Sequence, residues 1–347
     1  MSENHRRIVL RKRSYSETDS TNEAKKQKIE EKPIILENYT KKIESISQLL
    51  EIIKENKEYA NIQLKKLKNI KSELEDLNNL IGMKSLKKSI LNQILYYIQG
   101  LHVGGEDYLH TCIYGSPGMG KTTVAKILGK IFSKLGILRR NSFVTAQRED
   151  LIAGYLGQTA LKTRALLEVA KKGVLFIDEI YSLGDRENRD SFSKECIDTI
   201  NVFLSENKTE FMLIVAGYEK EIDECFFSQN QGLRRRFMWY HTIEEYTEED
   251  LAHMFIKKVK DNTWMLDENV NIAYLSELFK TNKEKFKNSG GDIENFLTIC
   301  KINHGVRSFL IDEAKKKILT KEDIEGSLKE FNEKKEKKDE PPPFMYL

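Results

Sequence analysis

Residues 115–123, "GSPGMGKTT", have the composition and spacing of a loop that binds the phosphates of a nucleotide. Its glycines let the backbone curl until successive N–H groups point at phosphate oxygens, at the start of a helix whose dipole favours anions. Lys121 can reach the β- and γ-phosphates, and the Thr122 hydroxyl is a ligand for Mg²⁺. We therefore expect ATP and Mg²⁺ as cofactors. The predicted contact residues of this loop are Gly115, Ser116, Pro117, Gly118, Met119, Gly120, Lys121, Thr122 and Thr123.

A pair of carboxylates ends the apolar run "GVLFIDE", residues 173–179. Asp178 stands where an acid at the end of a strand holds Mg²⁺ together with Thr122, and Glu179 stands where it orients or deprotonates an attacking water. A strand that ends in two acids is weak evidence by itself, because any buried strand can end that way. Downstream of a phosphate-binding loop, the pair predicts an ATPase site that converts ATP and water to ADP and phosphate, with Glu179 and Lys121 as catalytic residues.

Three consecutive arginines in "QNQGLRRRF", residues 229–237, are the next candidate. They form either a solvated basic turn or the source of an arginine that stabilises charge on the γ-phosphoryl group, a residue that a neighbouring subunit often supplies. Arg236 is the candidate for this catalytic role, and Arg234 is the second arginine to consider. With Arg236 in this role the active form is a homo-oligomer, and we expect a ring.

The segments that must position these residues alternate in type. Five short apolar runs are separated by segments that are mostly of helical length, which predicts a parallel β-sheet covered by helices on both faces. A strand-like run precedes the phosphate-binding loop, and an amphipathic helix follows it. After Glu244 the sequence has helical periodicity to about Asn332. The predicted strands are "TCIYG", "NSFVTA", "GVLFID", "FMLIVAG" and "FMWYHTI".

The two ends of the chain lack such patterns. Residues 1–38 are polar and poor in apolar periodicity, so we expect a disordered basic tail. The clusters from Arg11 to Arg13 and from Lys25 to Lys28 have the spacing of a bipartite nuclear-import signal, and a solvated tail is the alternative interpretation. Residues 332–347 are charged and then proline-rich, so we expect a flexible tail, with "PPPFMYL" as a candidate docking motif.

Residues 39–79 carry apolar side chains at spacings of three and four, which predicts amphipathic helices. The phase of this pattern breaks near Lys57, so we expect two helices rather than one continuous coiled coil. They either pack on the following domain or bind a partner. The apolar positions are Ile43, Ile46, Leu50, Ile53, Leu67, Ile70, Leu74, Leu77 and Ile81.

The composition is typical of a protein with a large solvated surface. Charged residues make up 32% and hydrophobic residues 39% of the 347 positions, without a run of 18 apolar residues. The first residues lack the apolar core of a secretory signal, so we expect a soluble, intracellular protein without a membrane partner. The net charge of +3 is small and gives no argument for nucleic-acid binding. Four scattered cysteines without a C-x-x-C pair predict reduced thiols rather than a disulfide or zinc site.

The order of the motifs resembles that of AAA+ ATPases, and among them the CbbX (CfxQ) and SpoVK group, which includes the red-type Rubisco activases. The resemblance covers about residues 80–246, where the phosphate-binding loop, "GYLGQTALKT", "GVLFIDEIYSL", "LIVAGY" and "GLRRRF" follow one another, and it continues more weakly to about Phe331. It implies a P-loop α/β domain with a five-stranded parallel sheet over residues 80–244 and an all-α lid domain over residues 245–331.

The resemblance also implies roles for individual residues. The segment "LIGM", Leu80–Met83, matches the segment that contacts adenine, with Ile81 and Gly82 as the predicted contacts. Arg236, with Arg234 beside it, matches the arginine-finger stretch. The Walker A and Walker B positions are matched by Lys121, Thr122, Asp178 and Glu179.

The segment "GYLGQTALKT" places a tyrosine between two glycines. Tyr155, Leu156 and Gly157 match the aromatic pore loop that grips a threaded polypeptide in rings of this group. A packing turn, with Tyr155 and Leu156 beneath the domain, is the alternative interpretation. Residues 184–192, "GDRENRDSF", fall where a second pore loop would lie.

Three features depart from the pattern of AAA+ proteins or of the group. Tyr218, in "AGY", stands after the fourth strand, where most AAA+ proteins have a polar sensor residue such as Asn, although the CbbX-like group shares this triplet. Gly291 and Glu294 stand where the lid of the group carries arginines. Either another basic residue such as Arg307 replaces them, or hydrolysis is slower and less tightly coupled to the lid. The "NPG" of the group is "NQG" at residues 230–232, a change that we expect to matter little.

Three functions are consistent with these patterns. The first is an ATP-driven ring that pulls on or unfolds a protein partner. The second is a nucleic-acid motor or loader, which the basic clusters favour but the small net charge and the lack of a recognised nucleic-acid-binding motif do not. The third is a scaffold that assembles with ATP and hydrolyses it slowly, which the missing lid arginines favour. The sequence does not identify the client protein.

Overall fold

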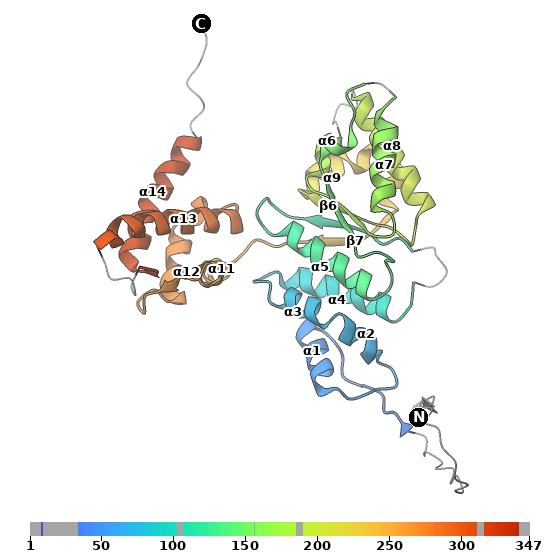
Figure 1. Ribbon diagram of the computed structural model, residues 1–347, viewed down its shortest axis with the longest axis horizontal. Coiled ribbons are helices and arrows are strands. Elements are labelled where there is room, and N and C mark those ends of the chain that lie inside the picture. The colour runs from blue at the N-terminus through green and yellow to red at the C-terminus, as the bar shows by residue number, and fades with distance from the viewer. Residues whose placement is uncertain are drawn as a thin grey trace, which may run out of the picture.

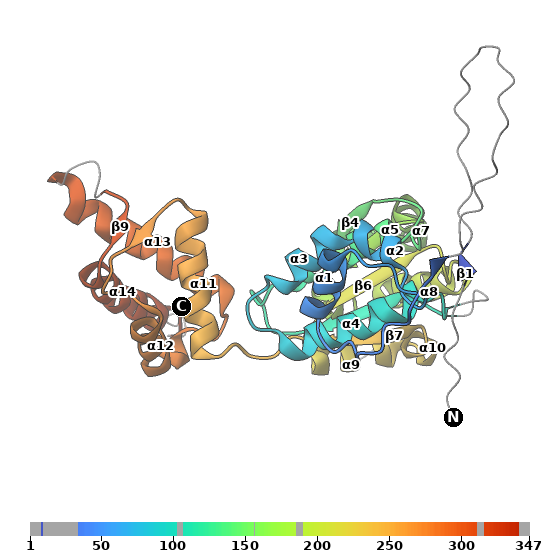
Figure 2. The same ribbon diagram turned by 90° about the horizontal axis from the view of Figure 1, so that it is seen from below.

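The computed structural model describes residues 8–9, 34–102, 107–155, 157–184, 190–310 and 316–339. Figures 1 and 2 show three parts in chain order: a group of amino-terminal helices, a domain with a central sheet, and a helical domain that follows strand β7. The amino-terminal helices lie against the sheet domain, and the helical domain stands to one side of it. The carboxyl-terminal helices are therefore positioned to act as a lid.

One sheet contains the five predicted strands in the order β4-β5-β6-β3-β7, and all neighbouring strands are parallel. Every residue of β3, β5 and β6 is buried, as expected for strands that are covered on both faces. The predicted α/β fold is confirmed. The strands are β3 (His110–Tyr114), β4 (Phe143–Ala146), β5 (Val174–Ile177), β6 (Met212–Gly217) and β7 (Phe237–Thr242).

Alternate residues of β3, β5 and β6 belong to two separate apolar cores, because successive side chains point to opposite faces of a sheet. In β3, Ile113 joins the core under α4 and α5, whereas Cys112 joins the core that contains α7 and α8. Figure 1 shows these helix pairs on opposite sides of the sheet. The helices of the first face are α4 (Lys84–Ile98) and α5 (Lys121–Lys134). Those of the second face are α6 (Arg148–Leu151), α7 (Thr159–Ala170), α8 (Ser191–Glu206), α9 (Glu219–Cys225) and α10 (Gln231–Arg234), with the short 3₁₀ helices η1 (Ile180–Leu183) and η2 (Phe227–Gln229).

All four cysteines are buried free thiols. Burial raises the pKa of Cys196 to about 11 and that of Cys300 to about 12. Both side chains therefore stay protonated near neutral pH, where a thiol is a poor nucleophile. Cys112 lies within strand β3, and Cys225 ends helix α9.

Three helices, rather than the predicted two, precede the sheet domain: α1 (Ile46–Glu55), α2 (Leu64–Asn69) and α3 (Lys71–Asn78). The predicted break near Lys57 falls between α1 and α2. The second predicted helix breaks again at Ile70, whose φ of −105° and ψ of 13° leave the helical region. Ile70 is fully buried, and Leu67 of α2 and Leu74 of α3 belong to the same apolar core. The two helices share this core with α4 and α5. These helices thus pack on the following domain.

Strand β1 (Ile8–Val9) pairs with β2 (Ile34–Ile35) in an antiparallel ladder, although we expected no regular structure before residue 39. The paired residues are all β-branched, which favours extended backbone. The two basic clusters of this tail lie outside the described residues.

Helix α14 (Lys321–Asp339) continues past Phe331, so the helix extends into the segment that we expected to be flexible. Lysine and glutamate are good helix formers, and pairs at i and i+4 support a solvated helix. One such pair joins Lys334 Nζ to Glu330 Oε1 at 2.6 Å. The "PPPFMYL" segment lies outside the described residues.

The helical domain has an aromatic core, in which neighbouring phenylalanine ring centroids are 4.9–6.4 Å apart. The phenylalanines are Phe255, Phe279, Phe286, Phe296 and Phe331. The one extended feature of its described residues is a short parallel ladder. The elements are α11 (Glu248–Asp261), α12 (Ile272–Thr281), η3 (Lys283–Lys285), α13 (Gly290–Arg307), η4 (Ser308–Leu310) and α14, with the ladder strands β8 (Met265–Leu266) and β9 (Ile318–Leu319).

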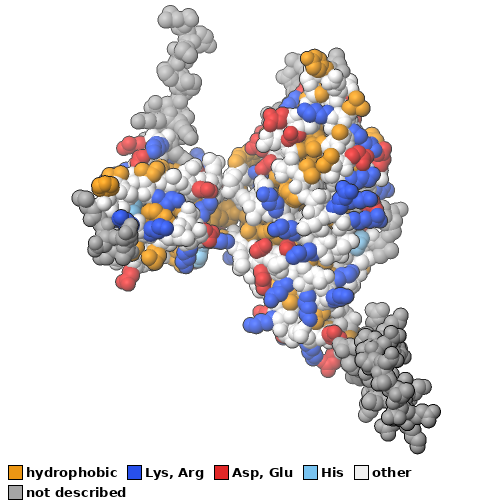
Figure 3. Space-filling model, in the orientation of Figure 1, with side chains coloured by type: hydrophobic (Ala, Val, Ile, Leu, Met, Phe, Trp, Pro, Cys, Tyr) orange, Lys and Arg blue, Asp and Glu red, His pale blue; other side chains and the backbone are white. Residues whose placement is uncertain are grey.

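The described surface is strongly polar. Figure 3 shows lysine and arginine side chains interspersed with aspartate and glutamate over the face in view, in keeping with the small net charge. Within the described residues, the helices are all too short or too polar to cross a membrane.

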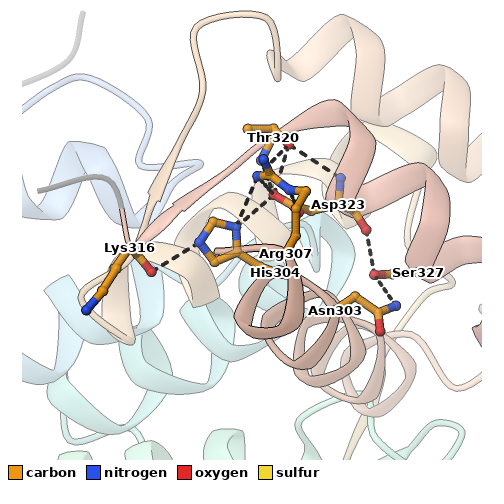
Figure 4. A network of polar contacts seen from close by, with 7 residues as sticks. All are labelled: Asn303, His304, Arg307, Lys316, Thr320, Asp323 and Ser327. Carbon is orange, nitrogen blue, oxygen red and sulfur yellow. Dashed lines mark hydrogen bonds and ion pairs between the residues drawn. The ribbon is translucent and has the colours of Figure 1, made fainter. Parts of the chain in front are cut away.

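A polar network joins α13 to α14 around Asp323 (Figure 4). His304 Nδ1 lies 2.9 Å from Asp323 Oδ2, and Arg307 Nε donates to Asp323 Oδ1 at 2.7 Å. The Thr320 N–H and hydroxyl donate to Oδ2 at 2.8 and 2.9 Å. Burial alone would raise the pKa of Asp323, but Arg307 and the other donors hold it well below its usual range.

Asp323→Asn should destabilise the helical domain by about 2 kcal/mol or more, because it leaves Arg307 and His304 without their buried charged acceptor. Since the pKa of Asp323 is lower in the folded than in the unfolded state, its contribution is present above about pH 4 and is lost as the pH falls. Urea unfolding followed through Trp264, whose ring centroid lies 5.4 Å from that of His304, measures this. Glu277→Gln, in an exposed pair, is the control and should change stability by less than about 0.5 kcal/mol. Equal stabilities of wild type and Asp323→Asn at pH 7 would contradict the prediction.

Candidate nucleotide-binding site

The loop between β3 and α5 is built around two glycines in the left-handed region. Gly118 has a φ of 75° and Gly120 a φ of 90°, conformations that glycine adopts without the steric penalty of other residues. The Lys121 side chain is buried, and its Nζ donates to the carbonyl oxygens of Gly115 at 3.2 Å and Ser116 at 3.1 Å. A lysine ammonium that is held by its own loop can exchange these neutral acceptors for phosphate oxygens, which make stronger hydrogen bonds.

A cavity of about 480 Å³ opens beside this loop, within the size range of small-molecule sites. Thr122 and Asp178, the predicted Mg²⁺ ligands, both line it, and Lys121 Nζ lies 3.9 Å from Asp178 Oδ1. Predicted residues that do not line it are Gly82, Gly115, Ser116 and Pro117. Those that do are Ile81, Gly118, Met119, Gly120, Lys121, Thr122, Thr123 and Asp178.

Sequence reasoning missed part of the lining. Tyr246, in the segment between β7 and α11, is buried, and its hydroxyl donates to the Met119 carbonyl at 2.9 Å. Gly82, at a φ of 62°, lies under this ring, because a Cβ at Gly82 would be 3.0 Å from Tyr246 Cδ1. Gly82 therefore shapes the site by close packing. Leu80 and Met83, which belong to the predicted adenine segment, also line the cavity. The other lining residues without a sequence prediction are Met254, Lys257, Lys258, Asp261 and Gly290.

The two carboxylates at the end of β5 face different spaces. Asp178 lines the cavity beside the loop and also a second cavity of about 500 Å³, whereas Glu179 lines only the second. Glu179 has a φ of 49° and a ψ of 44°, a left-handed conformation that is uncommon outside glycine. Its N–H donates to Asp178 Oδ1 at 3.0 Å. Burial, and then the charge of Glu179, raise the pKa of Tyr181 to about 12.

Arg148 links the wall of the second cavity to helix α8, a role that no sequence pattern indicated. Its guanidinium donates to the Ser182 carbonyl, to Ser193 Oγ at 2.9 Å and to Asp190 Oδ2 at 2.5 Å. Burial alone would raise the pKa of Asp190, but Ser193 and Arg148 lower it to about 2. Arg148 thus ties the segment that follows Glu179 to the start of α8.

The candidate arginines precede β7, at the end of the strands opposite to the phosphate-binding loop. Phe237 pairs with His110 at the start of β3, whereas the loop follows the end of β3, so about 15 Å of strand separates Arg236 from the loop. Arg236 donates to Ser205 Oγ at 2.6 and 3.0 Å and to the Gly232 carbonyl at 2.5 Å. Arg234 pairs with Asp223. In this geometry Arg236 cannot contact the cavity of its own subunit.

Comparison with known proteins places this site in a family. Residues 111–236 match the family described as "ATPase family associated with various cellular activities (AAA)". A cfxQ-like protein of Acanthamoeba polyphaga mimivirus is 39% identical over 72% of this chain, which spans 62% of that protein. A CfxQ homolog of Pyropia yezoensis is 30% identical over 74% of this chain and 86% of the homolog. The chain belongs to the CbbX/CfxQ family of AAA+ ATPases.

The fold of this CbbX/CfxQ family member is shared with distant solved structures. The AAA domain of FIGL-1 in complex with ADP has a TM-score of 0.52 at 19% identity, over 73% of this chain and 83% of that one. This likeness shows the AAA+ fold alone. Together with the family match it identifies an ATP-binding AAA+ protein.

The tyrosine of the predicted pore loop stands free of the core of this family member. Tyr155 is 74% exposed, and a Cβ at Gly154 or Gly157 would meet no atom within 4 Å. The ends of the loop are fixed, because Ala153 N donates to Thr159 Oγ1 at 3.2 Å and Lys162 Nζ donates to the Ile152 carbonyl at 3.0 Å. The alternative interpretation, that Tyr155 packs beneath the domain, is wrong. Leu156 and residues 185–189 lie outside the described residues.

The structure locates the residues that replace the expected lid arginines. Gly291 and Glu294, in the first turns of α13, both line the nucleotide cavity. Arg307 cannot replace the missing arginines, because it lies about 25 Å further along the same helix and pairs with Asp323. Tyr218 directly precedes α9, and its ring centroid lies 6.3 Å from that of Tyr181. It does not line the nucleotide cavity.

Proposed function

We propose that this protein hydrolyses ATP with Mg²⁺, assembles into a ring of identical subunits, and uses the turnover to pull on a polypeptide that Tyr155 grips. The observation that carries the ATPase proposal is the meeting of Lys121, Thr122 and Asp178 in one cavity, with Glu179 as the next residue. The separation between Arg236 and that cavity supports a ring, and the exposure of Tyr155 supports a polypeptide client.

The residues present fit Mg²⁺, a hard cation that prefers oxygen ligands. The Thr122 hydroxyl and the Asp178 carboxylate would hold it, and it would neutralise charge on the phosphates. Lys121 binds and orients the same phosphates once it leaves the carbonyls of its loop. Glu179 positions the attacking water and accepts its proton. Arg236 of one subunit stabilises the charge that develops at the site of the next.

The proposal is tested by measuring ATP turnover of the wild-type protein and sedimentation of the Glu179→Gln protein, each with and without Mg²⁺. Turnover that requires Mg²⁺, together with ATP-dependent rings, supports a motor. Rings with negligible wild-type turnover would instead support the scaffold function. A protein that stays monomeric with ATP would contradict the roles of both Arg236 and Tyr155. Lys121→Ala, which should not bind ATP, is the control for contaminating ATPases.

Tyr155→Ala should leave basal turnover within about twofold of wild type and remove its stimulation by an unfolded polypeptide. The side chain makes no core contact, so we expect a change in stability of less than about 0.5 kcal/mol. Turnover is measured with and without carboxymethylated lactalbumin, a permanently unfolded protein, and with double-stranded DNA for comparison. Stimulation that survives the substitution, or that only DNA produces, would contradict the polypeptide-gripping role. Leu161→Ala, at a similarly exposed position on α7, is the matched control.

A further inference from the structure

The cavity has cationic side chains on its lid side even though the arginines of the family are missing. Lys257 and Lys258 of α11 line it, as does Glu294 of α13. We infer that Lys258 supplies the positive charge of the lid to the terminal phosphates of bound ATP, and that Glu294 holds this lysine until the phosphates arrive. The inference rests on the ATP binding described above and identifies a phosphate-recognition residue on a different lid helix from the expected arginines.

The first step of the argument is that α13 begins on the phosphate-binding loop. A Cβ at Gly118 would lie 2.6 Å from the Asn288 carbonyl oxygen, and a Cβ at Gly290 would lie 2.6 Å from the Gly118 carbonyl oxygen. Such distances show backbone packed against backbone. Because Gly118 is one of the loop glycines, the first turn of α13 lies beside the position of the phosphates.

The second step places the ammonium of Lys258 near that turn. Glu294 is four residues after Gly290, so it lies on the same face of α13, about 5–6 Å further along. Lys258 Nζ lies 2.7 Å from Glu294 Oε2. This contact holds the Lys258 ammonium about one helical turn from Gly118, a gap that a long lysine side chain can cross.

The third step is that the ion pair between Glu294 and Lys258 is weak. The side chain of Glu294 is 68% exposed and that of Lys258 is 33% exposed, and ion pairs so open to water contribute little to stability. The hydrogen bond and charge of Lys258 lower the pKa of Glu294, so the carboxylate is ionised near neutral pH. The phosphates of ATP carry several negative charges and should displace a single exposed carboxylate.

The neighbouring cations are less suited to this role. Lys257 is exposed, and its Nζ donates to the Asn79 carbonyl at 3.4 Å. Lys260, on the same helix, does not line the cavity. Lys260→Met therefore removes the same charge from α11 without touching the site, which makes it a matched control for Lys258→Met.

The test measures the affinity of the full chain for ribose-labelled fluorescent ATP, ADP and AMP, in a Glu179→Gln background that prevents hydrolysis. Lys258→Met should weaken ATP binding about tenfold or more, ADP binding less, and AMP binding hardly at all, since a charged hydrogen bond to the terminal phosphate is lost. Glu294→Gln should strengthen ATP binding several-fold because it releases Lys258. Lys260→Met should match the parent protein for all three nucleotides.

A rescue separates recognition from structure. A Cβ at Gly291 would meet no atom within 4 Å, so the backbone position is open to a substitution, and Gly291→Arg places an arginine where the family has one. In the Lys258→Met protein, Gly291→Arg should restore the preference for ATP over AMP. Unchanged affinities in Lys258→Met, or equal losses for ATP, ADP and AMP, would overturn the inference.

The outcome can be told apart from failure of the proposed function. If the Glu179→Gln variants bind nucleotides in the predicted pattern but the wild-type protein shows no ATP turnover, the motor is refuted and the role of Lys258 stands. If Lys258→Met did not fold, Lys258→Gln and Glu294→Gln would provide the same comparison, because both keep a polar side chain on an exposed part of the lid.

Discussion

The Glu179→Gln protein should bind ATP with wild-type affinity and hydrolyse it at least about a hundredfold more slowly. The amide can still donate and accept hydrogen bonds, but it cannot take the proton of the attacking water. Glu179 does not line the cavity beside the phosphate-binding loop, so the substitution leaves the nucleotide contacts in place. With hydrolysis blocked, ATP stays bound and the assembled form should accumulate. Single-turnover hydrolysis and fluorescent ATP binding measure the two effects separately.

Glu149→Gln is the matched control, because Glu149 lines the same second cavity as Glu179 but does not follow Asp178. It should retain turnover within about twofold of wild type. Normal turnover in Glu179→Gln, or an equal loss in Glu149→Gln, would exclude Glu179 as the base. A loss of ATP affinity in Glu179→Gln would show instead that this carboxylate is needed to shape the loop.

Arg236→Ala should reduce turnover about a thousandfold while nucleotide binding persists. The register of β7 with β3 keeps Arg236 about 15 Å from the loop of its own subunit, so the loss must arise at a neighbouring site. Steady-state turnover and ATP affinity of the purified variant measure this. Arg235→Ala, at the exposed position next to it, is the control and should be close to wild type.

A mixing experiment decides whether the arginine acts between subunits. Lys121→Ala cannot use its own site but still presents Arg236, whereas Arg236→Ala has an intact site without a donor. Mixed in equal amounts, the two inactive proteins should recover part of the wild-type turnover. A mixture as inactive as its parts would contradict the assignment of Arg236. Because Arg236 also bonds Ser205 and Gly232 within the subunit, recovery would show too that the variant is folded.

Local patterns were sufficient to predict the sheet and one half of the site. The five strands are continuous apolar runs, and the loop with Lys121 and Thr122 depends on spacing within one short segment. Asp178 was predictable because the carboxyl ends of parallel strands lie at the same end of a sheet. The residues that follow β3 and β5 therefore lie near each other, with one strand, β6, between them. Such features need no knowledge of how distant helices pack.

The lid half of the site could not be predicted from local patterns. Lys258 and Gly290 line the cavity because α13 begins on the loop and α11 packs on α13, an arrangement that depends on the whole helical domain. Arg148 was also missed, since its three acceptors come from segments that follow it by 34 to 45 residues. The break at Ile70 was invisible because the apolar spacing on either side of it is compatible with one helix.

The burial of every native cysteine makes the protein well suited to direct spectroscopic observation. Cys112, Cys196, Cys225 and Cys300 are all enclosed, so thiol reagents should react slowly with the folded chain. Tyr155→Cys would then create a single reactive position at the tip of the loop that is proposed to grip the client. A spin label or dye attached there could report the movement of that loop through each nucleotide state without removing a native thiol.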